Sequence, residues 1–217
     1  MAFQITAAQL AAFAPSLKQI ELLPYVQAIN AAAAKVGIDQ SARRMRYFMA
    51  QSFFETKGYM KWDENLVYTT PQRLVDVWPS RFTMDKSITS KAYAPDFVNN
   101  PEKLANQVYM GRYGNVAPGD GWKFHGRGAF HLTFLNNYKT YGLWAYKDPQ
   151  KFVNAPDDVN LIENKFMSAA WFWQNNSLGA IADADGFTKM TGIINGSTDT
   201  VPQRLPVLKT ANTIFTW

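Results

Sequence analysis

The sequence predicts a mainly α-helical protein with little or no β-sheet. Its 217 residues are 47% hydrophobic and 18% charged, which is typical of a globular chain that can bury a substantial core. Two helix starts are marked by a capping residue followed by proline at the first helical position, at Thr70-Pro71 and Asn100-Pro101. Strand patterns are few and short, so we expect a single domain over residues 1–217.

Apolar residues recur at helical spacing through most of the chain. The N-terminal helical segment, residues 1–38, is expected to pack onto the rest of the domain. Pro206 stands early in the last expected helix and predicts a kink there. The segment 109–128 is rich in glycine, so we expect an ordered loop that approaches another part of the protein closely. The helices expected from hydrophobic spacing cover residues 25–35, 41–57, 136–144, 159–174, 187–194 and 202–213.

Two glutamates nine residues apart, Glu55 and Glu64, form the candidate catalytic pair. On an unbroken helix, at about 100° per residue, they would point to opposite faces. Gly58 accepts positive φ and suits a position just past a helix C-terminus, so we expect the helix to end there. Glu64 would then lie on irregular chain. Two carboxyls in different environments can serve as general acid and general base, as glycoside hydrolysis requires.

Aromatic side chains are dense around this glutamate pair. The apolar faces of sugar rings pack on such side chains, which favours a glycosidase site over solvated helix surface, the commonest setting of glutamate pairs. The same density is also compatible with an ordinary core, so both interpretations stay open on these residues alone. The aromatic residues are Phe53, Phe54, Tyr59, Trp62 and Tyr68.

The residue types present exclude several kinds of chemistry. The chain has no cysteine, which excludes disulfides and thiol catalysis. Its two histidines, His125 and His131, do not make a zinc site of the usual ligand types, so we expect neither a metal nor a cofactor. The N-terminus lacks a signal-peptide pattern, and no window of about 18 apolar residues occurs. We therefore expect a cytoplasmic product without stable membrane insertion.

The net charge of +5 and the pI near 9.3 favour a polyanionic partner such as a nucleic acid, an anionic membrane surface or an acidic cell-wall polymer. The basic residues are scattered, and their densest run, at 43–46, is shorter than nucleic-acid-binding arms. The aromatic residues are not interleaved with a basic stripe, as single-strand binding would need. A nucleic-acid partner is therefore the least favoured of these.

Four blocks of sequence carry a family resemblance. The first is the helix end at residues 50–59 together with Glu64-Asn-Leu-x-Tyr68. The most specific covers 105–138 and includes Gly-Arg-Gly-Ala-Phe-His-Leu-Thr at 126–133 followed by Asn-Tyr at 137–138, and the others lie at 166–173 and 193–196. In this order the blocks resemble the family 19 glycoside hydrolases, whose members are chitinases and phage peptidoglycan-cleaving endolysins. The resemblance implies a lysozyme-like helical domain of two lobes with a substrate groove.

Carried over by position, the resemblance implies that Glu55 is the general acid, Glu64 the general base, and Thr133 the residue that holds the attacking water. It implies an inverting mechanism, which needs the carboxyls about 6.5–9.5 Å apart. For Trp122 and Asn195 the alternatives are packing and helix C-capping, respectively. The implied substrate-binding residues are Tyr109, Trp122, His131, Asn137 and Asn195, and the implied supporting network is Arg127, Asp199 and Arg204.

Two positions depart from the family pattern. Phe54 stands where the family usually has histidine, and His131 where it usually has glutamine. Phe54 should make the surroundings of Glu55 drier, which favours a protonated acid. His131 keeps a donor and an acceptor but adds a titratable group, so we expect a pH dependence that a glutamine enzyme lacks.

Within the family, the short glutamate spacing, the absence of cysteine and of a signal peptide, and the positive charge match the phage endolysins. The resemblance thus implies cleavage of β-1,4 bonds in peptidoglycan glycan strands for host lysis. The protein would stay in the host cytoplasm until a holin-type pore releases it to the periplasm or cell wall, and we expect a monomer. The alternatives are a chitinase of the same fold and a catalytically silent sugar-binding protein.

Overall fold

The computed structural model describes residues 2–217, which fold almost entirely into helices, as the sequence predicts. Two short strands, β1 (Phe82–Thr83) and β2 (Ala92–Tyr93), pair in parallel. The α-helices are α1 (Ala7–Phe13), α2 (Gln19–Val36), α3 (Ala42–Glu55), α4 (Pro71–Val77), α5 (Pro101–Tyr109), α6 (Asp120–Lys123), α7 (Leu135–Tyr146), α8 (Lys151–Asn154), α9 (Ile162–Asn175), α10 (Leu178–Asp183), α11 (Phe187–Asn195) and α12 (Val201–Ile214). The 3₁₀ helices are η1 (Ile38–Gln40), η2 (Ala94–Phe97) and η3 (Pro156–Asn160).

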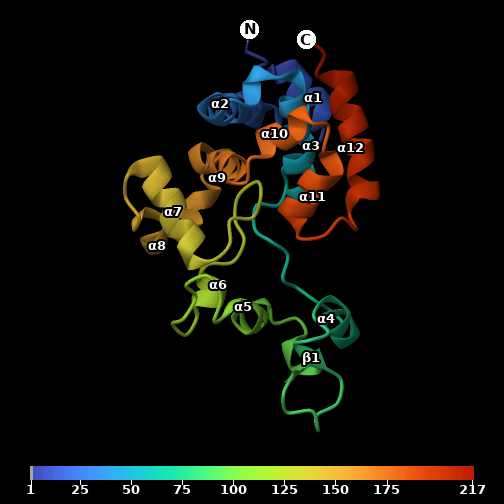
Figure 1. Cartoon of the computed structure of the whole chain (residues 1–217), viewed down its shortest axis with the longest axis vertical. Helices are drawn as coiled ribbons and strands as arrows, with labels where there is room; N and C mark the ends of the chain where they lie inside the picture. The colour runs from blue at the N-terminus through green and yellow to red at the C-terminus, as the bar shows by residue number, and fades with distance from the viewer. Residues whose placement is uncertain (1) are drawn as a thin grey trace.

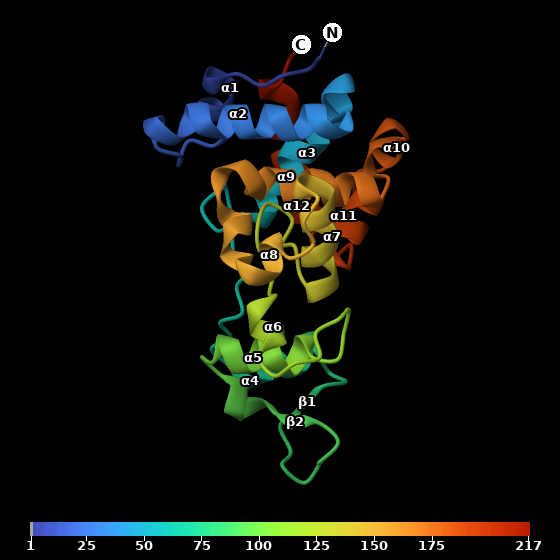
Figure 2. The ribbon, with the colours of Figure 1, turned by 90° about the vertical axis from the view of Figure 1, so that its left-hand side faces the viewer.

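The helices form two lobes stacked along the long axis of the molecule (Figures 1 and 2). The large lobe contains α1 to α3 and α7 to α12, and both termini lie at its far end. The small lobe contains α4, the two strands, α5 and α6. The chain leaves the large lobe after α3 and returns to it after α6, so these two connections pass between the lobes.

Helix α3 runs through the large lobe and carries Glu55 as its last residue. Its buried face includes Phe48 and Met49, and it packs against α12. The helix ends three residues before the predicted stop at Gly58. The hydroxyl of Thr56 donates to the carbonyl of Ser52 at 2.7 Å and accepts from the backbone N–H of Tyr59 at 3.0 Å, which closes the last turn early.

The N-terminal helices pack onto the rest of the large lobe. Helix α2 lies against α9, and α1 contacts both α2 and α12. An aromatic cluster joins these elements, with the rings of Tyr59 and Trp62 stacked 6.1 Å apart and Phe166 packed edge-on against both. This cluster fixes the chain that leaves α3 against the core of the large lobe.

The small lobe has its own core, centred on Leu74, Phe82 and Leu104. The glycine-rich segment is packed as closely as predicted, because a Cβ on Gly121 would lie 2.5 Å from the carbonyl oxygen of Ala105. Helix α6 can therefore lie directly on α5.

The predicted helices coincide with observed ones, and the starts of α4 and α5 fall at the two predicted prolines. Asn100 caps α5 by accepting from Lys103 N–H at 3.1 Å, whereas the side chain of Thr70 makes no capping bond. Helix α2 begins at Gln19, earlier than expected, and contains Pro24. Helix α1 lies within the helical segment expected at 1–38, whereas hydrophobic spacing does not predict the short helices α6, α8 and α10. Among residues 2–217, no helix combines the length and apolar character needed to cross a membrane.

Candidate active site

The Glu55 carboxylate lies at the C-terminal end of α3 and is 13% exposed. Its Oε1 accepts a hydrogen bond from Nη2 of Arg204, a fully buried residue of α12. Arg204 is itself held by Gln51 Oε1, 2.6 Å from Nη1, and by Thr200 Oγ1, 3.0 Å from Nε. The acid candidate is thus fixed by a buried ion pair between two helices of the large lobe.

The predicted supporting role of Arg204 agrees with this arrangement, but Asp199 does not join it. Asp199 is exposed and makes no ion pair with any described residue, and its neighbour Thr200 contacts Arg204 instead. The ring of Phe54 lies 4.3 Å from the guanidinium carbon of Arg204. Phe54 therefore covers the arginine that holds Glu55.

Glu64 lies on the connection from α3 to the small lobe, and both of its carboxylate oxygens are hydrogen-bonded. Oε1 accepts from the backbone N–H of Gly126 at 2.8 Å, and Oε2 from the hydroxyl of Tyr109 at 2.7 Å. Burial, followed by the charge of Glu64, raises the pKa of Tyr109, so the phenol stays a donor at neutral pH. Tyr109, which the resemblance implies to be a substrate-binding residue, lines neither of the cavities described below and instead contacts Glu64 directly.

The Thr133 hydroxyl and the Glu64 carboxyl both lie beside Gly126. A Cβ built on Gly126 would lie 3.2 Å from both the Glu64 carboxyl carbon and Thr133 Oγ1. Thr133 donates its hydroxyl proton to the carbonyl of His131 at 2.7 Å, so its oxygen can accept a hydrogen bond from a further donor such as water. Asn137 donates to the Thr133 carbonyl at 2.8 Å and supports this turn.

His131 lies next to Glu55. Its Nε2 is 3.1 Å from the Glu55 carbonyl oxygen and 3.9 Å from the Glu55 carboxylate. The carbonyl can only accept, so Nε2 carries the proton in that bond. The buried Nδ1 has no hydrogen-bond partner among the described residues, and the backbone φ of 49° lies in the left-handed region. The histidine thus contacts Glu55 from the position at which the family usually has glutamine.

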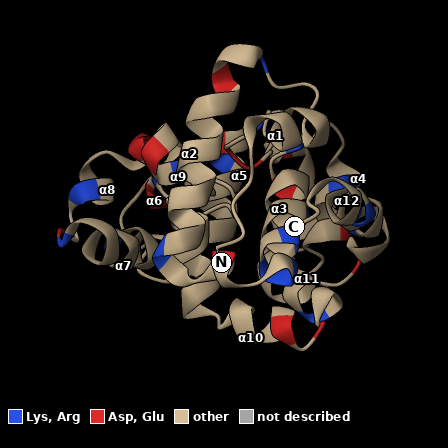
Figure 3. Cartoon of the chain, turned by 90° about the horizontal axis from the view of Figure 1, so that it is seen from above, with Lys and Arg blue, Asp and Glu red and all other residues tan. Residues whose placement is uncertain are grey.

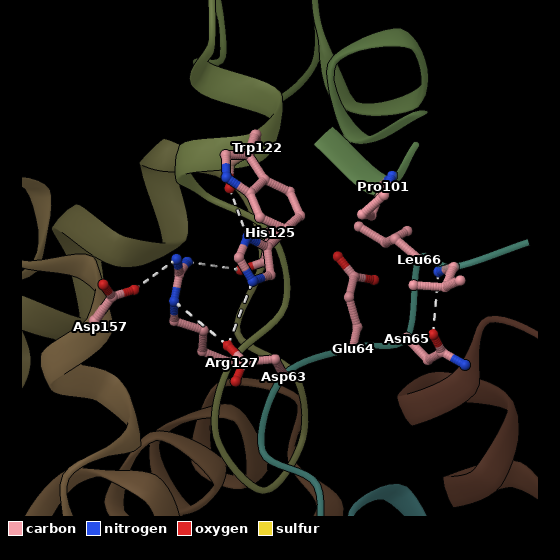
Figure 4. A pocket seen from close by; sticks show the side chains of 10 residues that line it. Asp63, Glu64, Asn65, Leu66, Pro101, Trp122, His125, Arg127 and Asp157 are labelled. Atoms are coloured by element: carbon pink, nitrogen blue, oxygen red, sulfur yellow. Dashed lines mark hydrogen bonds and ion pairs between the residues drawn. The ribbon is translucent and has the colours of Figure 1, made fainter. Parts of the chain in front are cut away.

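Both glutamates line one cavity of about 300 Å³. A second cavity, of about 350 Å³, is also lined by Glu64 (Figure 4). Residues 63–65 line both cavities, so the two are adjacent along this segment. A groove with a few convergent polar groups is the usual form of a ligand site. The first cavity is lined by Glu55, Lys57, Lys61, Asp63, Glu64, Asn65 and His131.

The second cavity brings together residues that the sequence analysis predicted only in part. Trp122 lines it and stacks on His125 with 4.4 Å between ring centroids, so packing and cavity lining coincide in this residue. His125 Nε2 lies 3.3 Å from Asp63 Oδ1, and that hydrogen bond is the main cause of a lowered Asp63 pKa. The buried Arg127 bonds Asp157 at 2.8 Å. Figure 4 shows this cluster facing Glu64 across the cavity.

Asp63, His125 and Asp157 were not predicted, although each stands close in sequence to a predicted residue or helix. The sequence signal for two of them is position, since Asp63 precedes Glu64 and His125 precedes Gly126. Asn195 does not line either cavity, and its amide bonds the Ser197 carbonyl at 3.3 Å within its own turn. Among residues 2–217 no three metal-ligating side chains gather at one point.

A helical protein of two lobes, with two separately held carboxyls lining one groove, has the architecture of a glycoside hydrolase. A scan against protein-family models found no match. A Haemophilus influenzae protein described as a glycosyl hydrolase family 19 domain-containing protein is 30% identical over 187 residues, which cover 82% of each chain. The chain therefore belongs to glycoside hydrolase family 19, and it is a glycoside hydrolase.

Solved structures show the same fold. Chitinase C from Streptomyces griseus superposes with a TM-score of 0.64 at 19% identity, covering 99% of this chain and 93% of that one. A second bacterial family 19 chitinase gives a TM-score of 0.62 at 19% identity, covering 97% and 94%. The helical fold is thus that of family 19 chitinases along almost the whole chain.

Proposed function

We propose that this glycoside hydrolase cleaves β-1,4 bonds of bacterial peptidoglycan as an endolysin, by an inverting mechanism with Glu55 as acid and Glu64 as base. The observation that carries the mechanism is that the two carboxyls line one cavity but are held from different lobes. Glu55 is fixed by Arg204 of the large lobe and Glu64 by Tyr109 of the small lobe. The cavity between them can take the reacting sugar and a water.

The proposed reaction is a single displacement. Glu55 gives its proton to the leaving glycosidic oxygen while water attacks the anomeric carbon from the opposite face. Glu64 takes a proton from that water, and Thr133 Oγ1 accepts the other hydrogen of the water in a hydrogen bond. Tyr109 and Gly126 hold the Glu64 carboxylate in place through the reaction.

The net charge of +5 favours an anionic wall polymer. The basic residues are interspersed with acidic ones when the molecule is seen from the end that carries the termini (Figure 3), an arrangement that does not favour a nucleic-acid partner. The proposal includes a monomeric enzyme, held in the host cytoplasm and released through a pore formed by another protein. A second candidate is chitin hydrolysis, because the solved structures with this fold include chitinases.

Product analysis tests the proposal. Purified peptidoglycan is incubated with the native protein, with Glu55→Gln, and with Glu102→Gln, which removes an exposed carboxyl on α5 as the control. We expect new reducing ends, read by mass spectrometry, with the native protein and the control but not with Glu55→Gln. Cleavage of soluble chitooligosaccharides without cleavage of peptidoglycan would support the chitinase. Wall binding without any product would identify a silent sugar-binding protein.

A further inference from the structure

The cavity that holds both glutamates also contains two lysines, Lys57 and Lys61. Three carboxyls line the same cavity, those of Glu55, Asp63 and Glu64. Without the lysines, the cavity would present mainly negative charge to whatever enters it. An anionic ligand would then be repelled, whereas a neutral sugar would not.

None of these three carboxyls is paired with Lys57 or Lys61. Glu55 is paired with Arg204. Asp63 accepts from Asn160 at 3.0 Å and lies within ion-pair distance of His125 and Arg127. The Glu64 oxygens are occupied by Tyr109 and Gly126, as described above. The Nζ groups of Lys57 and Lys61 make no hydrogen bond or ion pair with any described residue, and both side chains are exposed. Their charges are therefore available to a ligand.

One hydrogen-bonded turn presents the two lysines. Residues 57–59 have φ values of 49°, 77° and 65°, so a lysine begins a run of left-handed residues where glycine or asparagine would be less strained. The carbonyl of Thr56 accepts from the backbone N–H of Lys61 at 2.9 Å. The two lysines thus extend from the same turn, which follows α3.

We propose that Lys57 and Lys61 bind carboxylate substituents of the glycan, and so select a β-1,4-linked N-acetylated glycan that carries acidic groups over a neutral one. Peptidoglycan carries such carboxylates on the lactyl-linked peptides of alternate sugars, whereas chitin has none. This inference rests on the proposed function and names the feature of the substrate that the site reads. Each exposed lysine–carboxylate contact contributes modestly, and salt screens it.

The kinetic test compares the native protein with Lys57→Gln/Lys61→Gln on peptidoglycan and on a soluble neutral N-acetylglucosamine oligomer. We expect KM on peptidoglycan to rise about threefold to tenfold, with kcat and the kinetics on the neutral oligomer unchanged. The salt dependence of KM should weaken in the same variant. A KM that does not change, or one that rises equally on both glycans, would overturn the inference.

Two further variants separate charge from folding. Lys57→Arg/Lys61→Arg keeps both charges and should restore the native KM. Lys147→Gln/Lys209→Gln removes the same charge from exposed sites outside both cavities, and Lys147 has a similar left-handed φ of 59°, so this control should behave as native. An effect of the control equal to that of the test variant would attribute the change to net charge and overturn the inference.

A binding measurement distinguishes failure of the inference from failure of the proposed function. Co-sedimentation with intact peptidoglycan is measured in the Glu55→Gln background, with and without the two lysine substitutions. Lysine-dependent binding by a protein whose native form does not cleave peptidoglycan would overturn the function and leave the inference standing. If the native protein cleaves peptidoglycan but neither its binding nor its KM depends on the lysines, the inference is overturned and the proposed function stands.

Discussion

The hydroxyl of Tyr109 donates a 2.7 Å hydrogen bond to Oε2 of Glu64, 45 residues earlier in the chain. Tyr109 is the last residue of α5 in the small lobe, whereas Glu64 lies on the connection that leaves the large lobe. The position of the candidate base thus depends on a residue of the small lobe.

Replacing Tyr109 by phenylalanine removes this bond and leaves one Glu64 oxygen without its donor. We expect kcat to fall about tenfold to a hundredfold, because the base is no longer held in position. The free energy of unfolding should fall by about 1 kcal/mol. Tyr146→Phe, which removes a hydroxyl bonded to Asn164 outside both cavities, is the control for the steady-state kinetics. Native kcat in Tyr109→Phe would contradict the assigned role.

Replacing Arg204 by methionine leaves the Glu55 carboxylate and Gln51 without their buried partner. We expect the free energy of unfolding to fall by about 3 kcal/mol, since one member of a buried pair is left uncompensated. Adding Glu55→Gln should recover part of this loss without recovering activity. Urea denaturation measures both effects. Arg43→Met removes an exposed 3.8 Å ion pair with Asp185 and should cost less than about 1 kcal/mol.

Alkaline pH should destabilise the fold through its buried tyrosines. Burial is the main cause of raised pKa values for Tyr59, Tyr109, Tyr138 and Tyr141. Above about pH 10 the unfolded chain loses these protons while the folded protein keeps them, so stability is full below that pH and declines above it. Each such tyrosine contributes a slope of about 1.4 kcal/mol per pH unit. Urea midpoints from pH 8 to 11 would measure the decline, and a midpoint that stays constant would refute it.

His131→Gln should change the pH profile of kcat. Nε2 of His131 lies 3.9 Å from the Glu55 carboxylate. Histidine can change its charge near neutral pH whereas glutamine cannot, so native activity should fall toward the acid end of the range of about pH 5 to 8. The glutamine variant should keep more of its activity there. Identical profiles for the two proteins would remove this role.

The local features of the sequence predicted the fold well. The prolines at 71 and 101 each begin a helix, because the fixed φ of proline is a local property. Helix α3 ends between the two glutamates as expected, but Thr56 rather than Gly58 closes its last turn. The contacts of Glu64 with Gly126 and Tyr109 depend on how the lobes pack. The spacing of residues along the sequence does not predict that packing. The resemblance implies that Asp199 supports Arg204, yet the neighbouring Thr200 provides the contact.

The two carboxyls are held by different parts of the fold. Glu55 is bonded to Arg204 of the large lobe, whereas Glu64 is bonded to Tyr109 of the small lobe and to Gly126 of the connection that returns from it. The separation of acid and base is therefore set by how the two lobes and this connection pack, and not by α3 alone.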